Sequence, residues 1–106
     1  MTDALQALED QYIFLTNNLS DMLAACGNEA EKTAIKTQYA ASRRNYFGCV
    51  NQMLHDDDPA IQALVNQMKQ QQTALTAAVT HIGAIAGVIT AVTTAVQTGA
   101  ALAAKV

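Results

Sequence analysis

The chain has 106 residues, a formal net charge of -3 and a hydrophobic fraction of 51%, so it is long enough for one domain with a single core. One proline, five glycines and few strand-favouring runs are typical of an all-α protein built from long helices. Six basic residues without a cluster exclude nonspecific nucleic-acid binding, because neutralising a phosphate backbone requires clustered cations.

Charge is distributed unevenly along the sequence. All nine acidic residues lie in the first 58 positions, whereas residues 59–106 contain only Lys69 and Lys105. Cys26 and Cys49 form no CxxC motif, and we expect reduced, structural thiols in a cytoplasmic protein. The first ten residues are acidic and amphipathic, unlike a cleavable signal sequence. The alternatives to a cytoplasmic location are association with a membrane and secretion by a route that requires no cleaved signal.

The first half of the chain carries two apolar series at helical spacing. Leu5, Leu8, Tyr12, Leu15, Leu19, Met22 and Cys26 predict a helix over residues 3–26, with Thr2 or Asp3 as its N-cap. Ile35, Tyr39, Ser42, Tyr46, Cys49 and Met53 predict a second helix over residues 29–55. The pair Gly27-Asn28 separates them, as both residues tolerate left-handed dihedrals.

Asp56-Asp57-Asp58-Pro59 is the clearest break in the sequence. Asp58 is a suitable N-cap and Pro59 suits a first helical turn, so a third helix is expected over residues 59–104 after a turn at 56–59. The residues before and after the break form arms of similar length. The sequence therefore predicts a single helical domain, an elongated antiparallel hairpin with its first arm broken near Gly27-Asn28, that self-associates into a helical bundle or coiled coil.

The third predicted helix carries two stripes. One is an aliphatic heptad seam; it includes Leu64, Met68, Gln71, Leu75, Ile82, Ile85, Ile89, Val92 and Val96. On the nearly opposite side lies an uncharged series of small residues, where a surface helix would normally carry Lys and Glu; it includes Thr73, Thr76, Thr80, Gly83, Gly87, Thr90, Thr94 and Gln97. Since the first arm can cover only the seam, we expect a second copy, a partner helix or lipid to cover the other stripe.

Ten residues form the predicted interaction site. They are Gln71, Thr76, Thr80, Ile82, Gly83, Ile85, Gly87, Ile89, Thr90 and Thr94. Gly83 and Gly87 match GxxxG, a spacing that lets helix backbones approach closely in membranes and in water. Gln71 interrupts the seam, where a polar residue either fixes register and oligomer number or reaches the edge of the interface.

No arrangement of residues predicts catalysis, a cofactor or a metal site. His55 beside three aspartates lacks an EF-hand pattern, and the aspartates are expected to form a solvated acidic turn. Cys49 and His55 are six residues apart, which places them on different sides of one helix. Arg43 and Arg44 next to Tyr46 are expected to form a solvated edge.

The favoured hypothesis is a non-enzymatic structural or interaction protein. It would act as a homo-oligomer subunit or as a small partner that covers the apolar helix of another protein. In layout, Asp58-Pro59 followed by Ile61, Leu64 and Gln67 resembles the helical hairpins of bacterial secretion machines, such as needle subunits. This resemblance implies a secretion-associated role and covers the central third of the chain. The alternative hypothesis is a membrane-inserting or pore-type protein that uses residues 74–96.

Overall fold

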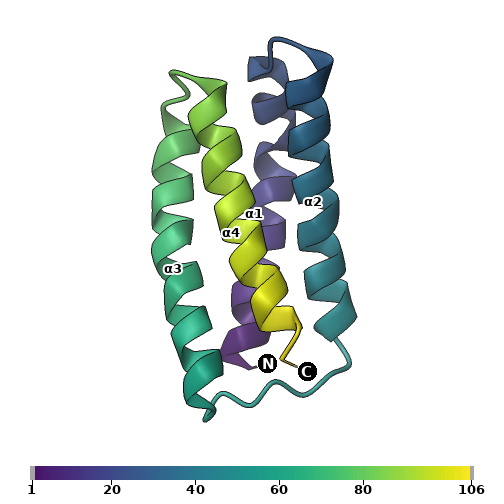
Figure 1. Ribbon diagram of the computed structural model, residues 1–106, viewed down its shortest axis with the longest axis vertical. Coiled ribbons are helices and arrows are strands. Elements are labelled where there is room, and N and C mark those ends of the chain that lie inside the picture. Colours follow the sequence, from purple (N-terminus) through teal and green to yellow (C-terminus); the bar gives the residue numbers. More distant parts are fainter. Residues whose placement is uncertain (1, 106) are drawn as a thin grey trace.

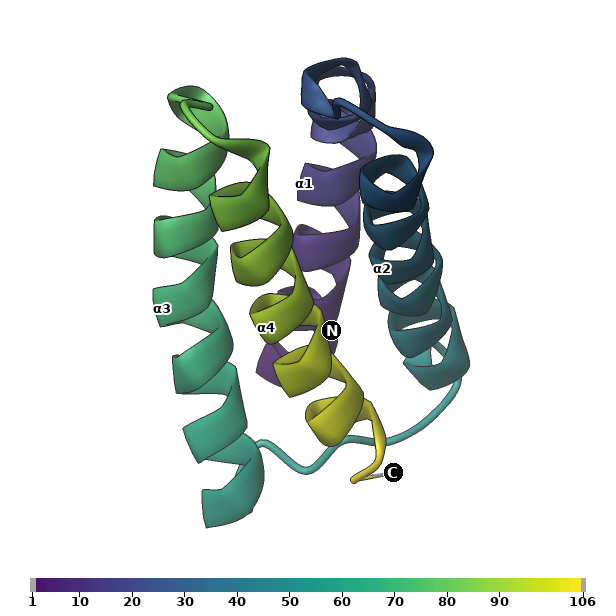
Figure 2. The same cartoon turned by 45° about the horizontal axis from the view of Figure 1, so that its top comes forward.

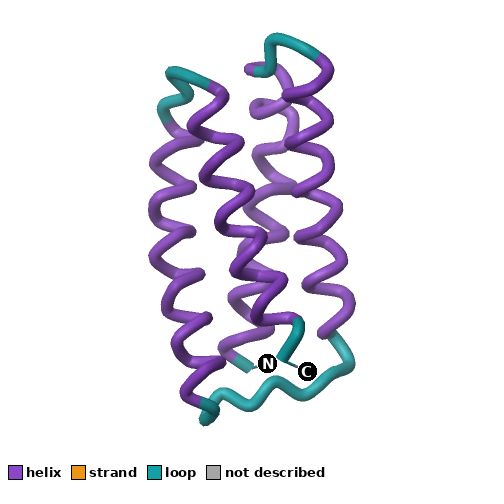
Figure 3. Tube along the Cα trace, in the orientation of Figure 1, coloured by secondary structure: helices purple, strands orange, loops and turns teal. Residues whose placement is uncertain are grey.

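The computed structural model describes residues 2–105, which fold into an all-α four-helix bundle with no strand in this range (Figures 1 and 3). The helices are α1 (Asp3–Ala25), α2 (Glu29–Cys49), α3 (Pro59–Thr80) and α4 (Ile85–Ala103). The all-α prediction is confirmed. The predicted elongated hairpin is wrong, because the chain reverses direction three times rather than once.

The helices alternate in direction and form two antiparallel hairpins, α1–α2 and α3–α4 (Figure 1). Helix α1 also packs on α3, and α2 packs on α4, which closes the four-sided bundle. Residues 50–58 cross its lower end from α2 to α3 (Figure 2). The outer face of the α1–α2 hairpin therefore lies opposite the outer face of the α3–α4 hairpin.

The predicted third helix is interrupted at residues 81–84, between α3 and α4. An unbroken helix over 59–104 would be about 69 Å long at 1.5 Å per residue, whereas the longest dimension of the molecule is 42 Å. Reversal allows Val88, Val92 and Val96 to be buried among the other helices. The interruption leaves no trace in the apolar spacing, because Ile82 and Ile85 continue the seam through the turn.

Helix α2 ends at Cys49 rather than at His55. In a longer helix, Met53 would continue the apolar series and Leu54 would lie about 100° away from it. The chain instead leaves the helix and buries Leu54, which is 2% exposed, while Met53 is 72% exposed. The end of α2 at Cys49 thus allows Leu54 to be buried under the bundle.

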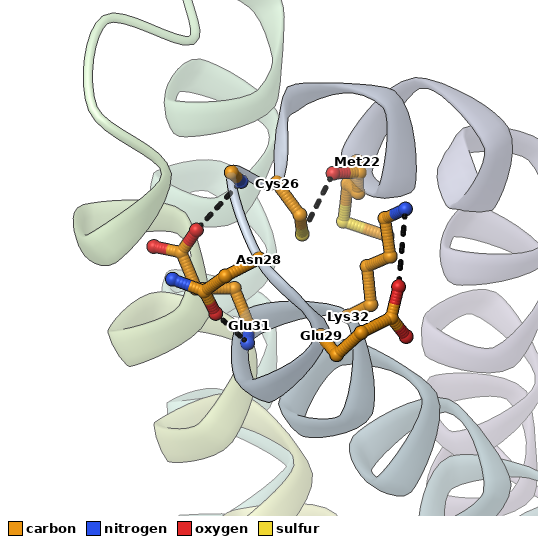
Figure 4. A network of polar contacts seen from close by, with 7 residues as sticks. Met22, Cys26, Asn28, Glu29, Glu31 and Lys32 are labelled. Carbon is orange, nitrogen blue, oxygen red and sulfur yellow. Dashed lines mark hydrogen bonds and ion pairs between the residues drawn. The ribbon is translucent and has the colours of Figure 1, made fainter.

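The α1–α2 connection is organised by capping rather than by left-handed backbone (Figure 4). Asn28 is the N-cap of α2, and its Oδ1 accepts a hydrogen bond from the Glu31 backbone N–H at 2.9 Å. The Glu31 carboxylate in turn accepts from the Gly27 backbone N–H at 2.7 Å. Residues 2–105 contain no positive φ angle, so the dihedral argument for Gly27-Asn28 is wrong although the break itself is present.

The acidic crossover caps two helices. Asp58 is the N-cap of α3, with Pro59 in its first turn, and its Oδ1 accepts from the Ala60 backbone N–H at 2.8 Å, as predicted. The Asp56 carboxylate accepts from the backbone N–H groups of Asp3 and Ala4 at 2.9 and 3.3 Å. A carboxylate at a helix N-terminus satisfies unpaired donors and complements the helix dipole. The aspartates therefore join the crossover to α1 as well as to α3.

The core consists of two apolar clusters separated by a polar layer. The cluster at the crossover end contains Leu8, Leu54, Ile61 and Met68, together with Leu102. The cluster at the far end contains residues from all four helices, namely Leu15, Met22, Ile35, Leu75, Val88, Val92, Ala95 and Val96. Between them lie the buried polar residues Gln11, Ser42 and Thr98 together with Gly99.

Candidate interaction surfaces

The structure divides the ten predicted interaction residues by exposure. Ile82, Ile85 and Ile89 are half-buried and pack on the far-end apolar cluster. Thr76, Thr80, Gly83, Gly87, Thr90 and Thr94 are all exposed. In the single chain these isoleucines are partly covered, whereas the small residues are exposed, and what covers the exposed residues stays a prediction.

Gly83 and Gly87 do not form a helix-packing motif within the chain. Gly83 lies in the turn between α3 and α4, and Gly87 lies in the first turn of α4. A Cβ atom added at either position would meet no atom within 4 Å. The predicted use of GxxxG on one continuous helix is therefore wrong, because Gly83 lies in the turn and only Gly87 lies on a helix.

The reversal also splits the small-residue stripe. Lys69 and Gln72 line a cleft with Ala7 and Asp10 of α1. Thr73 and Thr76 follow them by one helical turn, so they lie on the edge of α3 that faces α1. On α4, the carbonyl oxygens of Val96 and Ala103 accept hydrogen bonds from α2. Thr94 is two positions before Val96, about 200° around the helix, and thus points away from α2.

A set of exposed residues without charge remains on the α3–α4 hairpin. We call it the uncharged face and define it by its exposed residues, which are Gln67, Gln70, Ala74 and Ala77 of α3 and Gly87, Thr90, Thr94, Gln97 and Ala101 of α4. Lys69, the charged residue of α3, lies on the edge toward α1. Water-facing helices normally carry charged side chains on such a surface.

Threonines on the exposed surfaces of both helices satisfy their own hydroxyl donors. The Thr90 hydroxyl donates to the Ala86 carbonyl at 3.0 Å. Thr76 and Thr80 on α3 donate in the same way to carbonyls four residues earlier, at 2.8 and 2.7 Å. A hydroxyl that is bonded to its own helix presents mainly its methyl group to the outside. Such a surface loses little hydrogen bonding when water is removed from it.

Gln71 is half-buried at the level of the polar layer, between Met68 and Leu75 on α3. Its Oε1 atom is buried and accepts no hydrogen bond from residues 2–105, as is also true of Gln11 Oε1. Gln11 Nε2 donates to the Ala95 carbonyl at 2.8 Å. Gln71 thus belongs to the interior of the bundle rather than to its outer surface.

A cluster of aromatic rings lies on the outside of the α1–α2 hairpin. Tyr12 of α1 lies 5.8 Å from the Tyr39 ring, 5.9 Å from the Tyr46 ring and 5.5 Å from the Phe47 ring, between ring centroids. The Arg43 guanidinium lies over the Phe47 ring at 5.7 Å. The sequence argument did not find this cluster, because it treated Tyr12, Tyr39 and Tyr46 only as seam residues of separate helices.

Hydrogen bonds connect the tyrosine hydroxyls of this cluster to α1. Tyr46 donates to the Glu9 carboxylate at 2.6 Å, and this bond raises the pKa of the Tyr46 phenol. The hydroxyls of Thr16 and Tyr39 lie 3.2 Å apart, and their hydrogen bond lowers the pKa of Tyr39. The rings are therefore held in fixed positions on the surface.

The cysteines and His55 are residue types that often act in reactive sites, and their environments can be compared with that role. Burial raises the pKa of the Cys49 thiol, and burial together with the charge of Glu31 raises that of Cys26, which disfavours the reactive thiolate. Both cysteines are free, as expected. His55 lies in the crossover and not on α2, so the helix-face argument that separated it from Cys49 does not apply. No group of three metal-ligating side chains occurs within residues 2–105.

Helix α4 is long and apolar enough to cross a membrane, the one such helix in the described part of the chain. In the bundle, 39% of its most apolar 18-residue stretch is buried inside the molecule.

Comparison of the chain with protein-family models, with curated protein sequences and with solved structures found no match.

Proposed function

We propose that the chain is a non-enzymatic assembly module that associates with further copies of itself through the uncharged face. The observation that carries this proposal is that Lys69 is the single charged residue of α3 and α4, and that it lies on the edge toward α1, away from that face. Interface cores are depleted in charged residues, because a charge that loses water without a partner is costly.

The division of charge between the two hairpins supports the same proposal. The α1–α2 hairpin and the crossover carry all nine acidic residues and four of the six basic ones. The charged α1–α2 hairpin and crossover therefore keep the protein soluble. The α3–α4 hairpin can then be buried against a second copy. A symmetric pair of copies would bring two uncharged faces together without opposing like charges.

A membrane role for the α3–α4 hairpin is the second candidate. It rests on the length and apolar composition of α4, and on threonines that satisfy their own hydroxyls, which lowers the cost of removing them from water. Residues 74–96, which the sequence predicts as the inserting segment, do not form one helix, because α3 ends at Thr80 and α4 begins at Ile85. The inserting element would be α4, after separation from α1 and α2.

Light scattering on the protein purified without detergent separates the two candidates. We expect a defined oligomer with a mass of at least twice the 11.2 kDa of one chain. We also expect the protein to stay in solution when it is centrifuged with phosphatidylcholine vesicles. A monomer at all concentrations would contradict self-association. Sedimentation with the vesicles that survives a carbonate wash would favour the membrane candidate instead.

A further inference from the structure

We propose that the outer surface of the α1–α2 hairpin, opposite the uncharged face, binds an acidic peptide segment that carries an apolar side chain. The chemistry of the surface comes from one groove on α2. Tyr39, Ala40, Arg43, Arg44 and Phe47 line this groove, which has a volume of about 410 Å³. Its lining combines two aromatic rings with two guanidinium groups.

The cations at this groove have no carboxylate partner in the described chain. The ion pair found within residues 2–105 joins Lys32 to Glu29 at 3.6 Å, near the other end of α2. Arg43 is held against the Phe47 ring, and Arg44 is exposed beside it. Guanidinium groups bind carboxylates through paired hydrogen bonds, so the rim is complementary to Asp or Glu side chains.

The apolar part of the surface is also uncovered. Phe47 is 54% exposed, and Ile13 on the neighbouring helix is 45% exposed. The Phe47 ring packs edge-on against Tyr12, which holds it in place for contact with a partner. Rigid aromatic side chains next to arginine are the residue types that contribute most to binding energy at interfaces.

The chain's own carboxylates are poorly suited to fill this groove from a second copy. Six of the nine already accept hydrogen bonds or an ion pair within the chain, those of Glu9, Asp10, Glu29, Glu31, Asp56 and Asp58. Of the remaining three, Asp21 lies on α1, and Asp3 and Asp57 lie next to Asp56 at the crossover end, where the neighbouring carboxylates cap α1 and α3. A different polypeptide, with acidic residues that are not engaged in capping, is therefore the better match.

Nucleic acid and anionic lipid fit less well. Both bind to extended groups of four or more cations, whereas the groove has two arginines and the chain has a net charge of -3. The aromatic rings in the lining favour an aliphatic or aromatic side chain over a phosphate.

Fluorescence anisotropy with a labelled short peptide of glutamates flanking two phenylalanines tests this proposal. We expect saturable binding, with Kd raised at least about tenfold by Arg43→Gln with Arg44→Gln, equivalent to about 1.4 kcal/mol. Phe47→Ala should weaken binding by a comparable factor. Lys69→Gln with Lys105→Gln removes the same charge elsewhere and should leave Kd unchanged. Circular dichroism verifies that each variant is folded.

Several outcomes would overturn the proposal. They are no binding of the peptide, equal binding of its glutamine analogue, and an equal loss of affinity in the Lys69 and Lys105 control. Tight binding of polyuridylate or phosphatidylserine vesicles that depends on Arg43 and Arg44, with no peptide binding, would assign the surface to another ligand. The result does not depend on self-association, because the groove lies on the opposite hairpin.

Discussion

Replacing Gly99 with leucine is expected to destabilise the bundle by about 3 kcal/mol, through overpacking and the loss of a buried hydrogen bond. A Cβ atom at Gly99 would lie 2.8 Å from Gln11 Oε1, 3.4 Å from Asn45 Nδ2 and 3.5 Å from Leu8 Cδ2. Gln11 is 3% exposed, and its amide is held by the Ala95 carbonyl. The larger side chain therefore has to displace Gln11 or separate α4 from α1. Urea denaturation followed by circular dichroism measures the effect.

Gly48 provides the matched control, since it is also a helical glycine but would place a Cβ atom in open space. Gly48→Leu is expected to be neutral or to stabilise by up to about 1 kcal/mol, because leucine favours helix more than glycine does. Adding Gln11→Ala to Gly99→Leu should recover part of the lost stability, because the effects of substitutions at residues in contact are not additive. Equal stability of the Gly99 and Gly48 variants would refute the close approach of α1 and α4.

Placing two glutamates on the uncharged face is expected to weaken self-association at least about 100-fold, because each carboxylate would lose water without a cationic partner. Ala74→Glu and Thr94→Glu put one charge on each helix of the face, at positions that are exposed in the single chain. The fold of the single chain should therefore be unaffected. Sedimentation equilibrium measures the change in the association constant.

The control places the same two changes on α2. Ala30→Glu with Thr33→Glu adds the same charge at exposed positions of the opposite hairpin. This variant should associate like the original protein. An equal loss of association in both variants would mean that net charge, and not the uncharged face, governs assembly.

Local signals in the sequence predicted much of the secondary structure. The N-caps Thr2 and Asp58 act through their own neighbouring backbone N–H groups, so short-range chemistry is sufficient to identify them. The spacing of the apolar series defines one face of each helix, and residues such as Leu8, Leu15 and Ile35 on these faces are buried. The turn at residues 81–84 could not be read in this way, since the seam keeps its period across the reversal and no proline marks it.

Other features of the structure depend on contacts between residues that are far apart in the sequence. Gln11 and Gly99 meet across the bundle, and nothing in either local sequence indicates the pairing. The aromatic cluster joins Tyr12 to Tyr39, Tyr46 and Phe47, which requires knowing that α1 and α2 are antiparallel neighbours. By contrast, the lack of charge from residue 70 to 104 can be read from the sequence alone, and it predicts a surface that the first half of the chain leaves uncovered.

Isotope-filtered NMR on a mixture of ¹³C-labelled and unlabelled copies tests the assembly proposal most directly, because it requires no substitution. We predict intermolecular nuclear Overhauser effects from the methyl groups of Ala74, Ala77, Thr90, Thr94 and Ala101 on the uncharged face. Contacts confined to the α1–α2 hairpin, or no intermolecular contacts at concentrations where light scattering detects an oligomer, would contradict the proposal.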